Sequence, residues 1–211
     1  MTKTITRLFD DYSDATAALH DLERLGVPHD SISTVANNAD GAHGDATAVL
    51  GDANDSGDVS RGVSTGAAVG GVGGLLAGLG LLAIPGLGPI VAAGWLASTV
   101  VGAGIGAAGG AATGTIVGAL KDAGHSDDEA HVYSEGVRRG GTLLSARVDD
   151  TLLIEAGAIL DRHRSVDATV RGTAYRQDGW NSFDDTAPAY SRDEVAAERD
   201  RYRPTPTTTA Y

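Results

Sequence analysis

The chain has 211 residues and carries 28 acidic against 16 basic side chains, which gives a net charge of −12. This balance argues against nucleic acid as the main partner, because phosphate groups are neutralised by basic surfaces. The lack of cysteine excludes disulfides, thiolate metal sites and cysteine nucleophiles. The N-terminus has no apolar stretch of signal-peptide length, so we expect the protein to stay in the cytosol.

The first elements of the chain predict a βαβ unit. Residues 4–9 are a β-branched and apolar run that is typical of a strand. Ser13 is the expected N-cap of a helix, and Gly26 with the following Pro28 is expected to end it. Residues 31–36 predict the second strand. The two strands should run parallel, with a right-handed crossover between them.

A long neutral segment follows the first unit. Residues 38–61 are rich in Asp, Asn and Gly and predict an acidic flexible linker before residues 62–121. No charged residue lies between Gly62 and Leu120, whereas 18 of the 30 glycines do. Two ladders place a glycine at every fourth position. Their members are the expected helix-packing residues: Gly62, Gly66, Gly70, Gly74, Gly78, Gly102, Gly106, Gly110, Gly114 and Gly118.

This spacing predicts a glycine-zipper helical hairpin, because glycines on one face let two helices approach closely. Pro85, Gly86, Gly88 and Pro89 form its expected turn, between arms near 62–83 and 90–119. Each helical glycine costs about 1 kcal/mol relative to alanine, so the hairpin would not persist exposed to water. It must contact membrane lipid or pack through self-association, and the sequence leaves both possibilities open.

The residues after the hairpin predict a second strand–helix–strand unit. Ser126 and Glu129 form a capping box that begins a helix. Residues 142–148 and 168–175 predict the third and fourth strands, with a helix between them. We therefore expect an α+β fold. It would be a ferredoxin-like sandwich of two βαβ halves, residues 1–37 and 122–176, with helices on one face. The tail, 177–211, is predicted to be mostly disordered apart from a short helix at 192–202.

Arg147 and Arg171 suggest a polar sheet face. On the two strands predicted for the second half, these arginines alternate with apolar residues that would face the helices. The other face would then be open and bear both arginines. It is either a solvated surface or a binding surface for an anion or a partner, and the sequence does not identify a small-molecule ligand.

Three apparent cofactor or metal motifs lack the surrounding sequence that such sites need. Residues 104–109 match the dinucleotide fingerprint but do not follow a strand. Residues 52–63 begin like a calcium loop and end at Val63, where a bidentate Glu is needed. The capping box explains Glu129 beside His125 and His131 without a metal. We expect no cofactor, no metal site and no catalytic residues, and so no enzyme.

Two parts of the sequence resemble a family. Residues 81–96, which contain Ile-Pro-Gly-Leu-Gly-Pro, and residues 133–142 resemble bacterial general stress proteins, a group that includes heat-induced and low-temperature-induced proteins. The resemblance covers about residues 3–176 and implies a stress-associated, non-enzymatic protein. We therefore expect a cytosolic domain that is attached to, or inserted in, the inner membrane through the hairpin. The alternatives are a soluble homo-oligomer joined by the glycine ladders and an anion-binding module that uses the arginine face.

Overall fold

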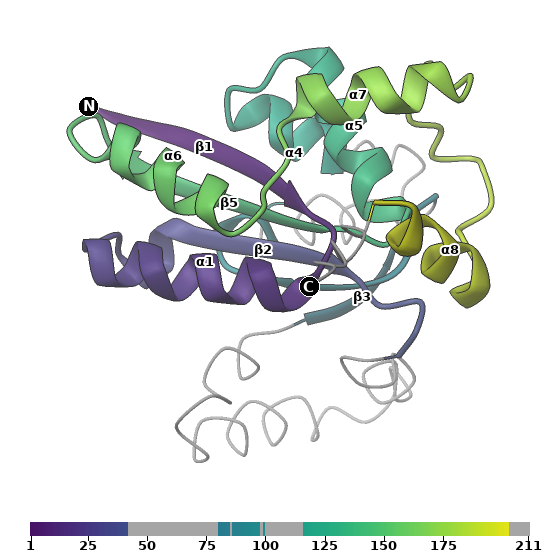
Figure 1. The fold of residues 1–211 in the computed structure, drawn as a ribbon, viewed down its shortest axis with the longest axis horizontal. Coiled ribbons are helices and arrows are strands. Elements are labelled where there is room, and N and C mark those ends of the chain that lie inside the picture. The colour runs from purple at the N-terminus through teal and green to yellow at the C-terminus, as the bar shows by residue number, and fades with distance from the viewer. Residues whose placement is uncertain (42–79, 85, 98, 100–115, 203–211) are drawn as a thin grey trace, which may run out of the picture.

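The computed structural model of the chain describes residues 1–41, 80–84, 86–97, 99 and 116–202. These residues form a mixed α+β structure (Figure 1). Its elements are β1 (Thr2–Phe9), α1 (Tyr12–Leu25), the 3-10 helix η1 (His29–Ser31), β2 (Ile32–Asn37), β3 (Gly80–Ile84), β4 (Gly88–Ala93), α4 (Ile116–Asp122), α5 (Asp127–Arg138), β5 (Thr142–Asp149), α6 (Leu153–Arg162), α7 (Ala168–Gln177) and α8 (Arg192–Tyr202).

The strands form one sheet in the order β1-β5-β2-β4-β3. Every neighbouring pair is antiparallel. Since β5 is antiparallel to both β1 and β2, these two strands run in the same direction, as predicted for the first βαβ unit. The helix between them begins two residues earlier than expected, because Asp11 and not Ser13 occupies the N-cap position.

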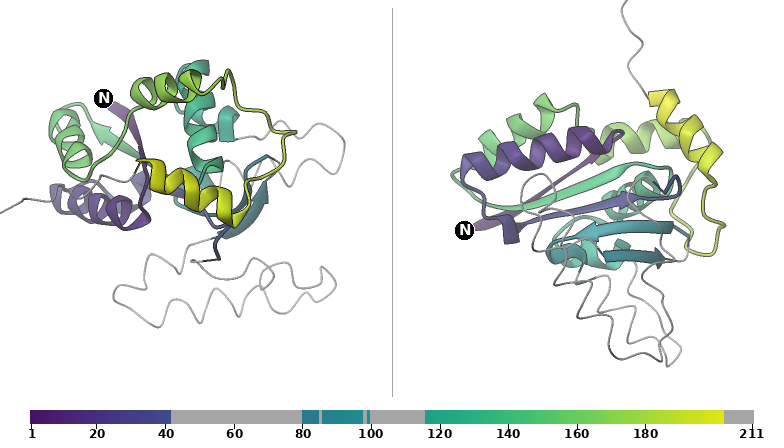
Figure 2. Two further views of the ribbon diagram at one scale, coloured as in Figure 1. Left: turned by 45° about the vertical axis from the view of Figure 1, so that its right-hand side comes forward. Right: turned by 90° about the horizontal axis from the view of Figure 1, so that it is seen from below.

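Helices cover both faces of the sheet (Figure 2). On one face, α1 and α6 pack over Phe9, Leu144, Ala146 and Val148. On the other face, α5 packs over Leu8, Val35 and Leu143, and α4 and α7 flank α5. The predicted alternation along the third strand is thus confirmed, but the predicted open polar face is wrong. Ser145 on that face is fully buried, because α5 lies over this part of the sheet.

The predicted fourth strand is a helix. Residues 168–177 form α7, and Asp167 caps it by accepting a hydrogen bond from the Val170 amide at 2.9 Å. Only a single bridge remains beside β1, where Leu8 and Val166 exchange two backbone hydrogen bonds of 3.0 and 2.8 Å. The second half is therefore strand–helix–helix, and the sheet does not contain two complete βαβ units.

The turn of the predicted helical hairpin is instead the turn of a β-hairpin. β3 pairs with β4 from Ile84 opposite Gly88 to Gly80 opposite Ala92. Gly86 and Gly88 turn the chain with φ angles of 76° and 81°, a region that favours glycine. The strands at 80–84 and 88–93 replace the ends of both predicted helical arms. Leu87 and Ile90 are buried in the core, so this part of the neutral segment belongs to the folded domain.

The C-terminal segment packs against the domain, although most of it was expected to be disordered. α8 occupies the residues for which a short helix is predicted, and Ser191 and Glu194 form its capping box. Phe183 and Val195 are buried, and Gly86 lies against the backbone at Asp184 and Asp185. Residues 178–202 therefore contribute to the apolar core on the α5 side of the sheet.

Candidate functional site

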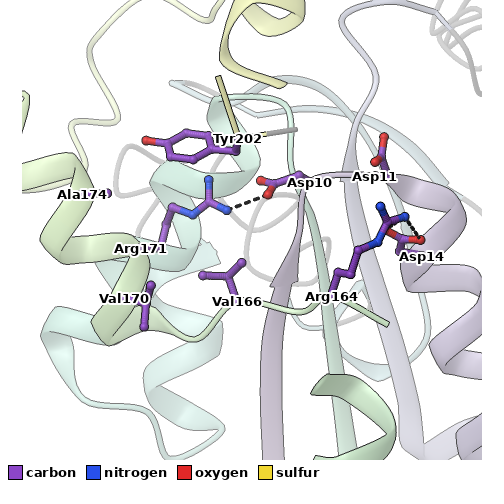
Figure 3. Close-up of a pocket in the computed structure, with 9 residues that line it drawn as sticks. All are labelled: Asp10, Asp11, Asp14, Arg164, Val166, Val170, Arg171, Ala174 and Tyr202. Carbon is purple, nitrogen blue, oxygen red and sulfur yellow. Dashed lines mark hydrogen bonds and ion pairs between the residues drawn. The ribbon is translucent and has the colours of Figure 1, made fainter. Parts of the chain in front are cut away.

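A cleft of about 330 Å³ opens where the start of α1, the α6–α7 connection, α7 and the end of α8 meet (Figure 3). These segments are far apart in the sequence. The bridge between Leu8 and Val166 holds the connection against the end of β1, and the next residues of the chain enter α1. The residues that line the cleft are Asp10, Asp11, Asp14, Arg164, Val166, Val170, Arg171, Ala174 and Tyr202.

One wall of the cleft contains a buried ion pair. Arg171 lies one turn into α7 with only 4% of its side chain exposed, and it donates a hydrogen bond of 2.8 Å to Asp10. The ring of Tyr202 lies over the guanidinium, 3.8 Å from it. Burial alone would lower the pKa of Arg171, but the hydrogen bond and charge of Asp10 outweigh this effect and raise it. Arg171 therefore remains a cation.

The opposite wall contains an exposed ion pair. Arg164 donates to Asp14 at 2.7 Å, and this hydrogen bond raises the pKa of the guanidinium. Arg164 has a φ of 61°, the left-handed conformation that L-residues with a side chain rarely adopt. This conformation ends α6 and turns the chain toward Val166. The turn thus brings both Arg164 and the bridging residue to the cleft.

Asp11 lies on the α1 side of the cleft, the same side as Asp14 (Figure 3). It occupies the N-cap position of α1, where an aspartate usually accepts a hydrogen bond from the first turn of the helix. Its carboxylate makes no such bond and, within the described ranges, no hydrogen bond or ion pair to any other side chain. It contributes only to the field around Arg164. The cleft therefore contains a carboxylate that the fold does not use.

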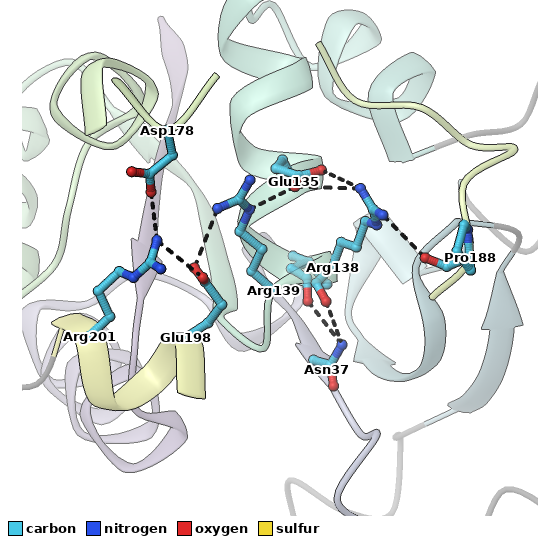
Figure 4. Close-up of polar contacts among 9 residues, drawn as sticks. Asn37, Glu135, Arg138, Arg139, Asp178, Pro188, Glu198 and Arg201 are labelled. Carbon is cyan, nitrogen blue, oxygen red and sulfur yellow. Dashed lines mark hydrogen bonds and ion pairs between the residues drawn. The ribbon is translucent and has the colours of Figure 1, made fainter. Parts of the chain in front are cut away.

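A second polar cluster joins α5 to the C-terminal segment (Figure 4). Glu135 is buried and accepts hydrogen bonds from Arg139 at 2.7 Å and from Arg138 at 3.2 Å. Arg139 also contacts Glu198 of α8 at 3.4 Å, and Arg138 donates to the carbonyl of Pro188 at 3.1 Å. Burial opposes the charge on Arg139, but the contacts with Glu135 raise its pKa. The cluster therefore links α8 to α5, and almost no free volume remains beside it for a ligand.

A third cluster has the connectivity of a nucleophile and a base. His125 Nε2 lies 2.7 Å from Thr6 Oγ1, which lies 2.9 Å from Ser145 Oγ, while Glu129 is 3.9 Å from His125 Nδ1. Thr6 is only 1% exposed and Ser145 is fully buried. Burial lowers the pKa of His125, which keeps the ring neutral. Because α5 covers both hydroxyls, this arrangement stabilises the packing of the helix on the sheet.

The two predicted surface arginines are not brought together. Arg147 is exposed on β5, and its guanidinium lies 3.8 Å from the ring of Trp95. Arg171 is on α7 and buried against Asp10. The predicted arginine face is therefore wrong, because the element that was expected to supply Arg171 as a strand is a helix.

Most of the predicted packing glycines lie outside the described residues. These are Gly62, Gly66, Gly70, Gly74, Gly78, Gly102, Gly106, Gly110 and Gly114, together with Pro85 of the turn. Gly118 is in α4. Gly86 and Gly88 turn the β-hairpin, and Pro89 is at the start of β4. Among the described residues, no three or more potential metal ligands lie together, and no helix has both the length and the apolar character needed to cross a membrane.

Of the residues that line the cleft, the sequence prediction named Arg171 as a possible anion-binding residue but not the others. Asp10, Asp11 and Asp14 look like an ordinary acidic helix start, and Tyr202 is the last residue of the short helix predicted within a mostly disordered tail. Comparison with known proteins gives no relative from which a role could be transferred. No protein-family model matches the chain, and neither the curated proteins nor the solved structures provide a match.

Proposed function

We propose that the chain is a non-enzymatic stress-response protein that attaches to a membrane through its neutral segment. The observation that carries the proposal is how this segment enters the fold. Its middle forms β3 and β4, and its end forms most of α4, with Ile90, Leu96 and Ile116 buried in the core. An uncharged part of the chain is thus held rigidly on a domain whose net charge is negative. The attachment would occur on the cytosolic side of the inner membrane.

The β-hairpin divides the neutral segment and so limits the length of chain that could enter the membrane. Residues 62–79 and 100–115 lie outside the described residues, on either side of the part that joins the sheet. Even a fully helical stretch of 18 residues would reach about 27 Å, which is less than the hydrocarbon thickness of about 30 Å. The proposal is therefore docking in the interface of the bilayer. The cost of about 1 kcal/mol for each helical glycine still favours packing of these stretches over exposure to water.

Flotation of the full chain with lipid vesicles tests this proposal. The wild type should float with vesicles of bacterial phospholipid composition, and the combined Gly70→Asp and Gly106→Asp substitutions should abolish flotation, because they introduce charge into the neutral segment. Gly51→Asp, in the segment predicted to be an acidic linker, is the matched control and should float like the wild type. Recovery of the wild type entirely in the lipid-free fraction, together with a soluble protein before and after stress in cell fractionation, would refute membrane attachment.

A second candidate, a homo-oligomer, is favoured by the edge of the sheet. β3 is the last strand in the sheet order, and among the described residues it pairs with β4 alone. It carries no charged residue, although charges are the usual protection of an edge strand against pairing with another chain. Edge-to-edge pairing of two copies would extend the sheet. In the sequence, the first glycine ladder directly precedes β3.

Light scattering distinguishes the two candidates. An oligomer that pairs through β3 should dissociate when Ala83→Lys places a charge in the edge strand. Ala48→Lys, in the segment predicted to be an acidic linker, should leave the mass unchanged. A monomeric mass for the wild type at micromolar concentration would exclude this candidate and leave the membrane proposal untouched.

We also propose that the domain has a ferredoxin-like fold, and the strand order supports this interpretation. β1 and β2 are parallel with β5 between them, and α1 and α6 share one face. In this interpretation, the bridge at Val166 occupies the position of the fourth strand, and α5 is an additional helix on the opposite face.

A further inference from the structure

The cleft contains a buried cation that retains unused hydrogen-bond donors. A guanidinium has five N–H groups. In the described part of the chain, the hydrogen bonding of the Arg171 guanidinium is limited to Asp10, and Tyr202 covers its face. Its remaining N–H groups have no acceptor in the same ranges. None of them is among the fully buried side-chain nitrogens without a hydrogen-bond partner, so they reach the solvent of the cleft. They can therefore donate to an oxyanion from outside, and a carboxylate has the planar geometry that matches a guanidinium.

The same cleft contains a carboxylate that makes no side-chain hydrogen bond among the described residues and acts only through the field around Arg164. Asp11 lines the cleft, and in the described ranges its carboxylate neither caps α1 nor joins an ion pair. Figure 3 shows Asp11 on the α1 side of the cleft and Arg171 on the α7 side. The two unsatisfied groups thus have opposite charge and come from opposite walls. A ligand that satisfies both must itself carry two opposite charges.

The surface between these groups is apolar. Val166 and Ala174 line the cleft together with Val170, which is 63% exposed although it is a large aliphatic side chain. Burying such a side chain against a ligand is favourable at about 25 cal/mol per Å² of apolar area. The volume of about 330 Å³ is at the lower end of ordinary ligand pockets. The space therefore suits a small molecule with an aliphatic body.

We infer that the cleft binds a small zwitterion with an aliphatic side chain, of the α-amino acid or dipeptide class. Its carboxylate would accept hydrogen bonds from Arg171, its ammonium group would pair with Asp11, and its side chain would cover Val170. The charges of the lining oppose a simple anion, because three aspartates stand against two arginines. A simple cation would leave the donors of Arg171 unused. This inference does not depend on membrane attachment or on self-association.

Amide-detected NMR titration of the full chain with L-leucine and with L-alanyl-L-leucine tests the inference. One of these probes should give saturable shifts at the residues that line the cleft. The corresponding amide, which lacks the carboxylate, and the N-acetyl form, which lacks the ammonium group, should each bind at least tenfold more weakly. No saturable shift with either probe would overturn the inference. Equal binding of a blocked form would also overturn it, since one charge would then suffice.

Two variants localise the site. Asp11→Asn should weaken binding at least tenfold without loss of folding, because the carboxylate does not cap the helix; Asp30→Asn, an exposed carboxylate in η1, is the matched control. Ala174→Met should block the cleft, whereas Thr173→Met places the same side chain on the exposed side of α7 and should not. Unchanged affinity in both Asp11→Asn and Ala174→Met would assign any binding to another place and refute the proposed site.

Discussion

Glu135 and Arg139 form an ion pair of 2.7 Å in which the carboxylate side chain is 1% exposed and the guanidinium 11%. The same carboxylate also accepts from Arg138. Removing one member of a buried ion pair leaves the others charged in a poorly solvated place, which typically costs 3–5 kcal/mol. Glu135→Ala should therefore lower the free energy of unfolding by about 3–5 kcal/mol, measured by urea denaturation.

Glu155→Ala provides the control for this loss. Glu155 is an exposed carboxylate in α6, in a helix on the other face of the sheet. Substitution of an exposed side chain away from such clusters changes stability by about 0.5 kcal/mol or less. A similar, small effect of both substitutions would mean that Glu135 does not stabilise the junction between α5 and α8.

The N-caps of α1 and α7 should respond differently to the same substitution. Asp167 accepts a hydrogen bond from the Val170 amide, whereas the Asp11 side chain makes no capping bond to α1. Loss of a capping side chain typically costs about 1 kcal/mol. Asp167→Ala should therefore destabilise the protein by about 1 kcal/mol in thermal or urea unfolding, and Asp11→Ala should change stability by a few tenths of a kcal/mol. Equal losses would show that Asp11 has a structural role.

Helix α7 shows why part of the fold could not be predicted. Thr169, Val170 and Thr173 are β-branched, and together with Arg171 they imitate the alternation of a strand. The residues that α7 buries are Ala168, Arg171, Gly172 and Tyr175. Their spacing is helical. Two of these buried positions are an arginine and a glycine, so the helical period does not appear in the pattern of hydrophobic residues. The ion pair between Arg171 and Asp10 stabilises the helical conformation, but it is a tertiary contact that the local sequence does not show.

The β-hairpin was missed for a related reason. β4 lies inside the sheet between β2 and β3, and Ile90, Val91 and Ala92 are all buried. A strand that is buried on both faces does not alternate, so a short apolar run cannot be told from a helix by its period. Predictions with a local cause, namely the parallel strands of the first βαβ unit and the capping box of Ser126 and Glu129, were confirmed. The cleft assembles residues from distant segments and could not be predicted in this way.

Gly94 is the glycine whose replacement should be most damaging next to the hairpin. It has a φ of 83°, and a Cβ atom there would lie 2.3 Å from the carbonyl oxygen of Ile32. A left-handed residue with a side chain costs about 1–2 kcal/mol, and overpacking adds about 1–3 kcal/mol. Gly94→Ala should therefore destabilise the protein by about 2–5 kcal/mol in urea unfolding.

Gly124→Ala separates these two contributions. Gly124 has a φ of 100°, but a Cβ atom there would meet nothing within 4 Å. Its replacement should cost only the conformational part, about 1–2 kcal/mol. If Gly94→Ala costs no more than Gly124→Ala, the close approach of the chain after β4 to β2 does not contribute to stability.

The stability of the protein should decrease as the pH falls below about 6.5, the usual pKa of histidine, through the protonation of His125. Burial lowers the pKa of His125 in the folded state, and the nearby charge of Arg7 acts in the same direction, against the opposing effect of Glu129. The unfolded chain then binds a proton that the folded protein does not, so acid favours unfolding. One such proton gives a slope of at most about 1.4 kcal/mol per pH unit.

Urea unfolding of three proteins between pH 7.5 and 5 tests this assignment. His125→Gln should be less stable than the wild type at pH 7.5 but should lose the part of the pH dependence that His125 causes. Thr6→Val removes the hydrogen bond between Thr6 and His125 but keeps the buried imidazole. This variant should therefore be less stable than the wild type at every pH, and its stability should depend on pH with the wild-type slope. Parallel pH profiles for the wild type and His125→Gln would show that another group is responsible. The two variants thereby separate the hydrogen bond of His125, which acts at all pH values, from its burial, which acts only where the unfolded chain takes up the proton.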